Sequence, residues 1–89
     1  VVELQGLKNA LKVYPNPVLD RVTFDFNSDL TSQLEQIRII SQIGQVVDSQ
    51  FINRARVSFS TENLKAGIYY FEIIGENGTL GSGRLIKSE

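Results

Sequence analysis

The sequence has no cysteine and no histidine among its 89 residues. Without cysteine, the chain can form no disulfide, no thiolate zinc site and no thiol nucleophile. Without histidine, it lacks the commonest general base and the commonest metal ligand. These two absences exclude the most frequent designs of a catalytic or metal centre.

An excess of charge of one sign is also lacking. Nine Lys and Arg against ten Asp and Glu give a formal net charge of −1. No overall field therefore draws the chain to nucleic acid or to an anionic membrane surface. The longest apolar run falls far short of the ~20 residues that span a bilayer, so we expect no membrane span.

The oxygen-bearing side chains that remain form no convincing reactive site. Ser58, Ser60 and Thr61 have no His partner, no carboxylate pair is marked out as an acid/base couple, and no Gly-rich loop is placed to cradle a phosphate. We therefore expect no enzyme activity and no cofactor.

One partial metal motif is present. Asp25, Asn27 and Asp29 carry oxygen atoms at alternate positions, like the opening of a calcium loop. However, Leu30 stands where such a loop needs Gly, and Gln36 stands where it needs a bidentate Glu. The favoured interpretation is that these residues form the solvent-exposed face of a strand and the turn that follows it.

Length and composition indicate a single globular domain. A hydrophobic fraction of 42% with 21% charged residues is ordinary for such a domain. We expect residues 1–10 to be a linker or a short first strand, and residues 11–89 to be the domain. The sequence begins at Val1 with no visible signal peptide, which favours a piece of a longer protein, although an arbitrary boundary would look the same.

Period-two alternation of apolar and polar residues predicts strands, with turn residues between them. Gly81 and Gly83 weaken the interior of the last strand, and Asn77-Gly78 is expected to supply the central pair of a hairpin turn. The predicted strands cover residues 11–14, 21–27, 36–41, 45–51, 56–60, 68–74 and 80–87. About seven short strands without a convincing helix predict an all-β fold, an antiparallel β-sandwich of Ig-like type.

Several short motifs follow one another along nearly the whole chain, from residue 11 to residue 87. They are Val13-Tyr14-Pro15-Asn16-Pro17, the alternating Val22, Phe24 and Phe26, Ile39-Ile40 before Gly44-Gln45-Val46-Val47, Leu64-x-x-Gly67-x-Tyr69, and Arg84-Leu85-Ile86-Lys87. In this order and spacing, the sequence resembles the type A C-terminal sorting domain of proteins exported by the type IX secretion pathway, the Por secretion system family.

The resemblance implies a passenger protein joined upstream, which passes through the periplasm and crosses the outer membrane through the type IX apparatus. A surface sortase-like peptidase usually removes the domain, and the cut is expected within residues 1–10. The resemblance implies a protein of the cell surface or a secreted one.

Recognition is expected at Arg84, Leu85, Ile86 and Lys87. A closing strand at a sheet edge offers backbone groups for strand addition by a receptor, and also for a dimer. Arg84 and Lys87 add charge, while Leu85 and Ile86 divide between core and surface. The other motif residues are expected to be structural, with Gly67 permitting a turn and Tyr69 anchoring a corner; they are Tyr14, Pro15, Asn16, Pro17, Gly44, Leu64, Gly67 and Tyr69.

Two other functions fit an all-β domain of this size. One is an adhesion or carbohydrate-binding module of a secreted enzyme, for which Tyr14 and the outward-pointing Tyr70 are the only candidates for an aromatic sugar platform, since Trp is absent. The other is a structural spacer, whose deletion would not stop export.

Overall fold

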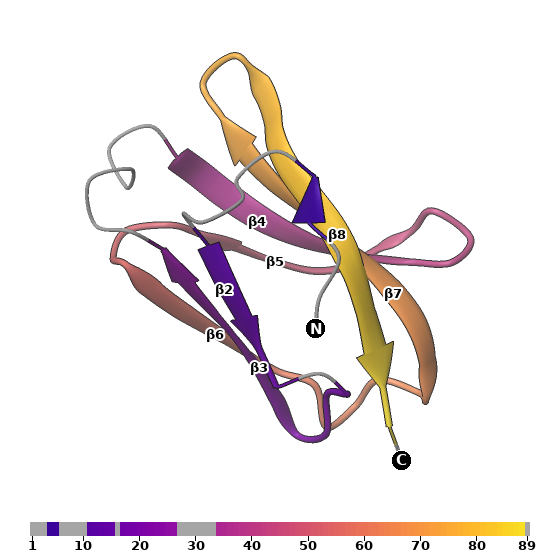
Figure 1. Ribbon diagram of the computed structural model, residues 1–89. Coiled ribbons are helices and arrows are strands. Elements are labelled where there is room, and N and C mark those ends of the chain that lie inside the picture. Colours follow the sequence, from indigo (N-terminus) through magenta and orange to yellow (C-terminus); the bar gives the residue numbers. More distant parts are fainter. Residues whose placement is uncertain (1–3, 6–10, 16, 27–33, 89) are drawn as a thin grey trace.

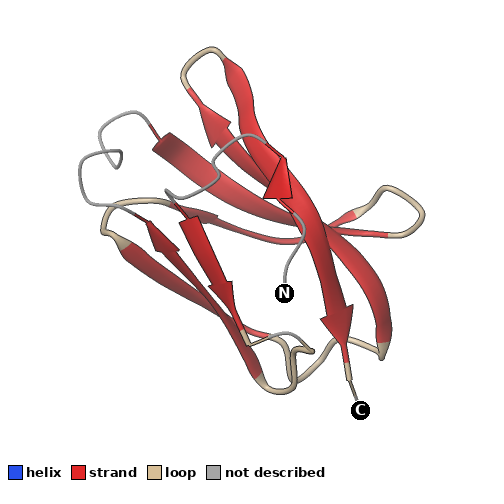
Figure 2. Ribbon diagram, viewed as in Figure 1, coloured by secondary structure: helices blue, strands red, loops and turns tan. Residues whose placement is uncertain are grey.

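Alternating apolar and polar residues fold into strands joined by turns, and the part of the chain that the structure describes contains no helix (Figure 2). The computed structural model describes residues 4–5, 11–15, 17–26 and 34–88. Its strands are β1 (Leu4–Gln5), β2 (Leu11–Tyr14), β3 (Arg21–Phe26), β4 (Leu34–Ser41), β5 (Val46–Phe51), β6 (Arg56–Ser60), β7 (Gly67–Gly75) and β8 (Gly78–Lys87).

The strands form two antiparallel sheets that pack as two layers (Figure 1). The larger sheet has the order β1-β8-β7-β4-β5, and the smaller has the order β2-β3-β6. The prediction of an antiparallel β-sandwich is confirmed. Within the described residues, no helix is long and apolar enough to cross a membrane.

The core lies between the two layers and is filled from both. Phe24 on β3 meets Phe59 of its own sheet at a ring-centroid distance of 5.6 Å and Phe71 of the opposite sheet at 5.0 Å, both edge to face. Edge-to-face aromatic pairs add to the stabilisation that burial alone gives. The buried apolar residues are Leu11, Val18, Val22, Phe24, Phe26, Leu34, Ile37, Ile39, Ile52, Val57, Phe59, Phe71, Ile73 and Leu85.

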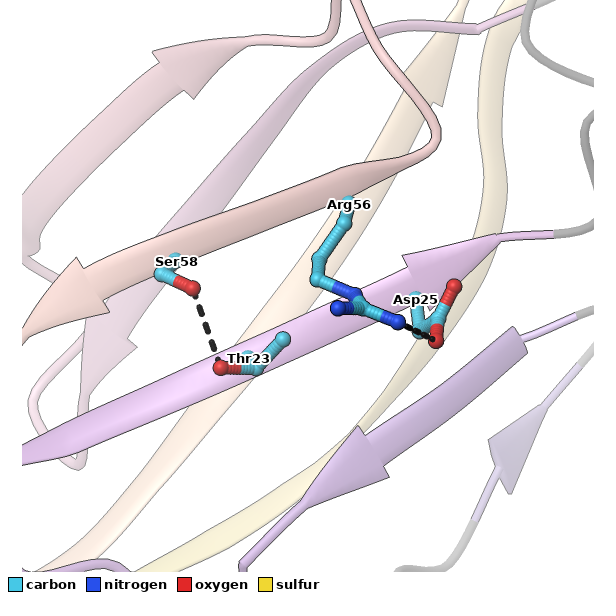
Figure 3. Close-up of polar contacts among 4 residues, drawn as sticks. All are labelled: Thr23, Asp25, Arg56 and Ser58. Atoms are coloured by element: carbon cyan, nitrogen blue, oxygen red, sulfur yellow. Dashed lines mark hydrogen bonds and ion pairs between the residues drawn. The ribbon is translucent and has the colours of Figure 1, made fainter.

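The outer face of the smaller sheet is polar (Figure 3). The hydroxyls of Thr23 and Ser58, which are cross-strand neighbours, lie 3.0 Å apart in a hydrogen bond. The next pair toward the strand end is Asp25 and Arg56, whose carboxylate and guanidinium are 3.2 Å apart. Alternation explains the arrangement, since Val22 and Phe24 on the same strand point into the core.

Two details of the last hairpin differ from the prediction. Gly75 pairs with Gly78, so the turn is centred on Glu76-Asn77, and the prediction that Asn77-Gly78 form the central pair was wrong. The strand register shifts between Ile73 and Ile74, which makes room for an extra residue on β8. This bulge sets the position of the turn and lets β8 begin at Gly78.

The predicted polar turn at residues 28–33 lies outside the described residues, as do Asn16, Asn27 and Asp29 of the predicted motifs. Strands β2 and β6 have the predicted limits, and β4 and β7 extend slightly beyond theirs.

Candidate recognition surface at the closing strand

Strand β8 divides the four predicted recognition residues between the inside and the outside of the sandwich. Leu85 is 3% exposed and Lys87 is 9% exposed, because positions 85 and 87 share the inward face. Arg84 and Ile86 are exposed on the opposite face. The expectation that Leu85 and Ile86 divide between core and surface is confirmed. The expectation that Lys87 offers its charge to a partner finds no support in this burial.

The ammonium of Lys87 is engaged inside the domain. It donates a hydrogen bond to the backbone carbonyl of Leu19 and another, 3.1 Å long, to the carbonyl of Ser88. The Leu19 carbonyl also accepts a hydrogen bond of 2.8 Å from the hydroxyl of Thr61, a residue only 2% exposed. One carbonyl therefore joins three segments that are distant in the sequence, and Lys87 acts as a structural anchor.

The backbone at the end of β8 is also engaged. The amide of Val18 donates to the carbonyl of Ile86 at 2.7 Å, and the amide of Ser88 donates to the carbonyl of Val18 at 2.7 Å. Further along, β1 pairs with Ser82 and Gly83. The prediction that the closing strand forms the edge of its sheet was therefore wrong, because β1 and Val18 cover that side of it.

Strand β5 forms the opposite end of the larger sheet. The amide of Ser49 donates to the carboxylate of its neighbour Asp48 at 2.8 Å, and the side-chain amide of Gln50 donates to the carbonyl of Ser58 on β6 at 2.7 Å. Local contacts of this kind make an edge strand less available for pairing with another chain. The predicted dimer through an edge strand stays a prediction.

The Tyr-Pro-Asn-Pro motif lies where the smaller sheet approaches the closing strand. Tyr14 is the last residue of β2 and is joined to Pro15 by a cis peptide bond. Pro17 immediately precedes Val18, which is 1% exposed and bonded to β8. Because proline cannot donate to a strand ladder, the motif ends β2 and leads the chain across to the larger sheet. The residue that directly follows the first predicted motif thus contacts the last one.

The Leu-x-x-Gly-x-Tyr motif forms a corner before β7. The hydroxyl of Tyr69 donates to the carbonyl of Lys65 at 2.8 Å, which is the corner contact expected from the sequence. Gly67 has a φ of +147°, a conformation that disfavours other residues. The amide of Leu64 donates to the carbonyl of Thr61 at 3.1 Å. The motif is thereby joined to Thr61, whose hydroxyl donates to the Leu19 carbonyl.

Gly44 closes the turn between β4 and β5. Its φ of +88° lies in the left-handed region, and its amide donates to the carbonyl of Ser41 at 3.0 Å. This geometry agrees with the structural part expected of Gly44.

The predicted motifs together fall within a match to a known protein family. A model of the secretion system C-terminal sorting domain matches residues 12–88. The chain belongs to this family. As a sorting domain it has the role of a C-terminal signal for type IX secretion, which implies interaction with the type IX machinery and export through the periplasm to the cell surface or beyond. The family is one of sorting signals and not of enzymes.

Solved structures resemble the sorting domain in fold. A DUF3244 family protein from Bacteroides vulgatus with an immunoglobulin-like β-sandwich fold is 25% identical at a TM-score of 0.77, with 98% of this chain and 96% of that chain covered. The CBM51-2 and INT domains of Clostridium perfringens ZmpB give 16% identity and a TM-score of 0.56, with 83% of this chain and 17% of that chain covered. The Ig-like prediction is confirmed.

CopC from Methylosinus trichosporium OB3b gives 14% identity and a TM-score of 0.52, over 88% of this chain and 93% of that chain. At such identities the likeness concerns the fold alone. A search of the curated proteins found no match.

The two tyrosines considered for a sugar platform are far from forming one. Tyr14 is 41% exposed on β2 of the smaller sheet, and Tyr70 is 43% exposed on β7 of the larger sheet. Because Lys12 and Tyr14 alternate with the buried side of β2, Tyr14 faces outward on the opposite layer from Tyr70. The sorting domain therefore does not combine them in one surface.

Of the partial calcium motif, the structure describes only Asp25, which takes part in an ion pair. The carboxylate of Asp25 pairs with Arg56, and no group of three or more acidic residues gathers among the described residues.

Proposed function

We propose that the sorting domain delivers a passenger joined upstream of residue 11 across the outer membrane, and that the type IX machinery reads it through the closing strand. Within Arg84–Lys87, the roles divide by position. Arg84 and Ile86 make the contact with the machinery, whereas Leu85 and Lys87 hold the strand in place. The observation that carries this proposal is the opposite facing of the two pairs, with Leu85 and Lys87 buried.

The rigidity of strand β8 supports this division of roles between the two pairs of residues. Because passengers differ in shape, the domain itself has to display the signal. Strand β8 pairs with β7 over nine positions and is anchored at its end by Val18 and Leu19. The side chains of Arg84 and Ile86 are thereby held on one face at fixed spacing, which lowers the entropy lost when a partner binds.

A reporter passenger fused upstream of the domain tests this proposal in a cell that has the pathway. Arg84→Glu with Ile86→Thr should trap the reporter in the periplasm while the purified domain unfolds at nearly the denaturant concentration of the parent. Lys87→Met should act through stability, so a lower temperature should restore its export. Normal surface delivery of the Arg84→Glu/Ile86→Thr variant would contradict the proposal.

Deletion of residues 11–89 distinguishes a sorting signal from a structural spacer, since loss of a spacer should not stop export.

We further propose that a sortase-like peptidase cuts within residues 1–10. Leu11 is 5% exposed and belongs to the core, so a cut upstream of it spares the core, and a cut after Gln5 would release only the short strand β1 from the larger sheet. Mass spectrometry of the released domain should find a new N-terminus between positions 2 and 11. A cut within β2 or later would contradict this placement.

A further inference from the structure

Strand β5 is the end strand of the larger sheet and contains no buried residue. Two of its apolar side chains are exposed, Val47 at 39% and Phe51 at 78%. The strand has neither Lys nor Pro, two residues that commonly protect an exposed sheet edge from pairing with other chains. A groove of about 470 Å³ lies beside its end, lined among others by Phe51, Arg54 and Ser58. Strand β5 therefore has the character of an edge that can accept another strand.

The ladder between β4 and β5 shows which backbone groups of β5 point outward. The amide of Ile52 donates to the carbonyl of Glu35, and Gln50 occupies the equivalent place two positions along this ladder. Because hydrogen-bonded and non-hydrogen-bonded pairs alternate in an antiparallel ladder, Gln50 directs its backbone groups toward β4. The backbone groups of Ser49 and Phe51 consequently point away from β4, toward the open side of the strand.

The sequence of β5 is complementary to itself around Ser49. Two copies that pair antiparallel, with a two-fold axis at Ser49, bring the two Ser49 backbones together as a hydrogen-bonded pair. The same register places Phe51 of each copy opposite Val47 of the other, and aromatic side chains opposite β-branched ones stabilise cross-strand pairing. Since a two-fold contact is complete with two copies, this pairing makes a dimer and not a filament.

Asp48 occupies the backbone group on which this pairing depends. Its carboxylate accepts a hydrogen bond of 2.8 Å from the amide of Ser49. A second copy would have to displace this carboxylate from both Ser49 amides, because the two-fold axis uses each of them once. Asp48 also lies opposite Ile39, which is only 1% exposed, and an inward-facing charge on an edge strand opposes pairing. The two Asp48 carboxylates of a dimer would moreover be diagonal neighbours across the axis, where like charges repel.

We propose that β5 is a self-pairing edge whose partner is a second copy of this chain, and that Asp48 prevents this pairing in the intact domain. The sorting domain is then a monomer at micromolar concentration, and loss of the Asp48 carboxylate converts it to a dimer about Ser49. Such protection suits a domain that passes through the periplasm, since an open edge invites association with other chains. Strands β4 and β7 separate β5 from β8, so this role of Asp48 is independent of the contact proposed at the closing strand.

Sedimentation velocity over a series of concentrations tests the role of Asp48. Asp48→Ala should form a dimer whose dissociation constant is at least about tenfold lower than that of the parent chain, since one competing hydrogen bond is lost on each copy. Glu62→Ala makes the same change of charge at an exposed position in the turn after β6, and it should associate like the parent. If Asp48→Ala does not fold, Asp48→Val takes its place, because valine favours strands and has no acceptor. Equal association of the parent and the Asp48 variant would overturn the proposal, and so would a parent that is already a dimer.

A disulfide cross-link tests the register, because the chain has no cysteine of its own. Ser49→Cys in the Asp48→Ala chain should give a disulfide-linked dimer under mild oxidation. The Cα atoms of a hydrogen-bonded antiparallel pair are about 5.5 Å apart, which a disulfide can span. Thr79→Cys in the same chain, at an exposed position of β8, is the control and should stay unlinked. A dimer that does not cross-link through position 49, or open-ended aggregates in place of a dimer, would overturn the two-fold pairing at β5.

Discussion

The ammonium of Lys87 and the backbone carbonyl of Leu19, 68 positions apart in the sequence, are joined by a hydrogen bond. Since Thr61 donates to the same carbonyl, this contact ties the end of the last strand to two earlier segments. A residue that looks like a surface charge in the sequence is thus part of the framework.

Replacement of this lysine should weaken the fold. Lys87→Met leaves the strand register intact but removes a charged donor at a buried site, so we expect the free energy of unfolding to fall by about 1.5–3 kcal/mol. Denaturant titration measures the change. Lys65→Met, at an exposed position in the corner before β7, is the matched control and should stay within about 0.5 kcal/mol of the parent. Equal stabilities of the two variants would contradict the anchor.

The corner hydroxyl of Tyr69 should contribute measurably on its own. Tyr69→Phe removes only the hydrogen bond to Lys65, and we expect a loss of about 1 kcal/mol. Tyr70→Phe makes the same chemical change on the next residue, which is 43% exposed, and should change stability far less. Thermal or denaturant unfolding of the pair gives the comparison, and an equal loss in both would show that the corner contact is unimportant.

Gly44 should resist substitution for backbone reasons. No atom lies within 4 Å of an added Cβ, so Gly44→Ala meets no steric contact, and only its φ of +88° opposes the change. We expect a loss of about 1–2 kcal/mol from this conformation. Gly44→Asn should lose less, because asparagine tolerates positive φ better. If alanine were as stable as glycine, the turn would have to adopt another conformation.

The two polar pairs on the smaller sheet should differ in salt sensitivity. The Asp25–Arg56 ion pair has side-chain exposures of 30% and 67%, so a double-mutant cycle should give a coupling of about 0.2–1 kcal/mol that shrinks in 1 M salt. The Thr23–Ser58 hydrogen bond joins neutral hydroxyls, and its coupling should persist in salt. Salt-dependent coupling of the hydroxyl pair would contradict this assignment.

Much of the fold was predictable because apolar alternation and turn residues act locally. Val22, Phe24 and Phe26 point inward as their spacing of two requires, and Tyr69 makes the corner contact expected from its place after Gly67. The same rule contained a signal for Lys87, which stands two residues after the buried Leu85 and so shares its side of the strand. The charge of Lys87 made it look like a surface residue.

Other features depend on segments that only the folded chain brings together. The Leu19 carbonyl receives Thr61 and Lys87 from two distant segments, and no local pattern predicts such a meeting. The hairpin turn moved by one residue because the strand bulge next to Ile74 outweighed the preference of Asn-Gly for the central turn positions.

The late position of β8 in the sequence has a consequence for protein synthesis. This strand lies second in the larger sheet, between β1 and β7, although it is the last described strand to leave the ribosome. A product whose translation stopped before residue 78 would leave β7 paired with β4 alone and would leave β1 without its partner strand. If the export machinery contacts the closing strand as we propose, only a completed polypeptide carries the signal, and a passenger whose translation ended early would not be exported.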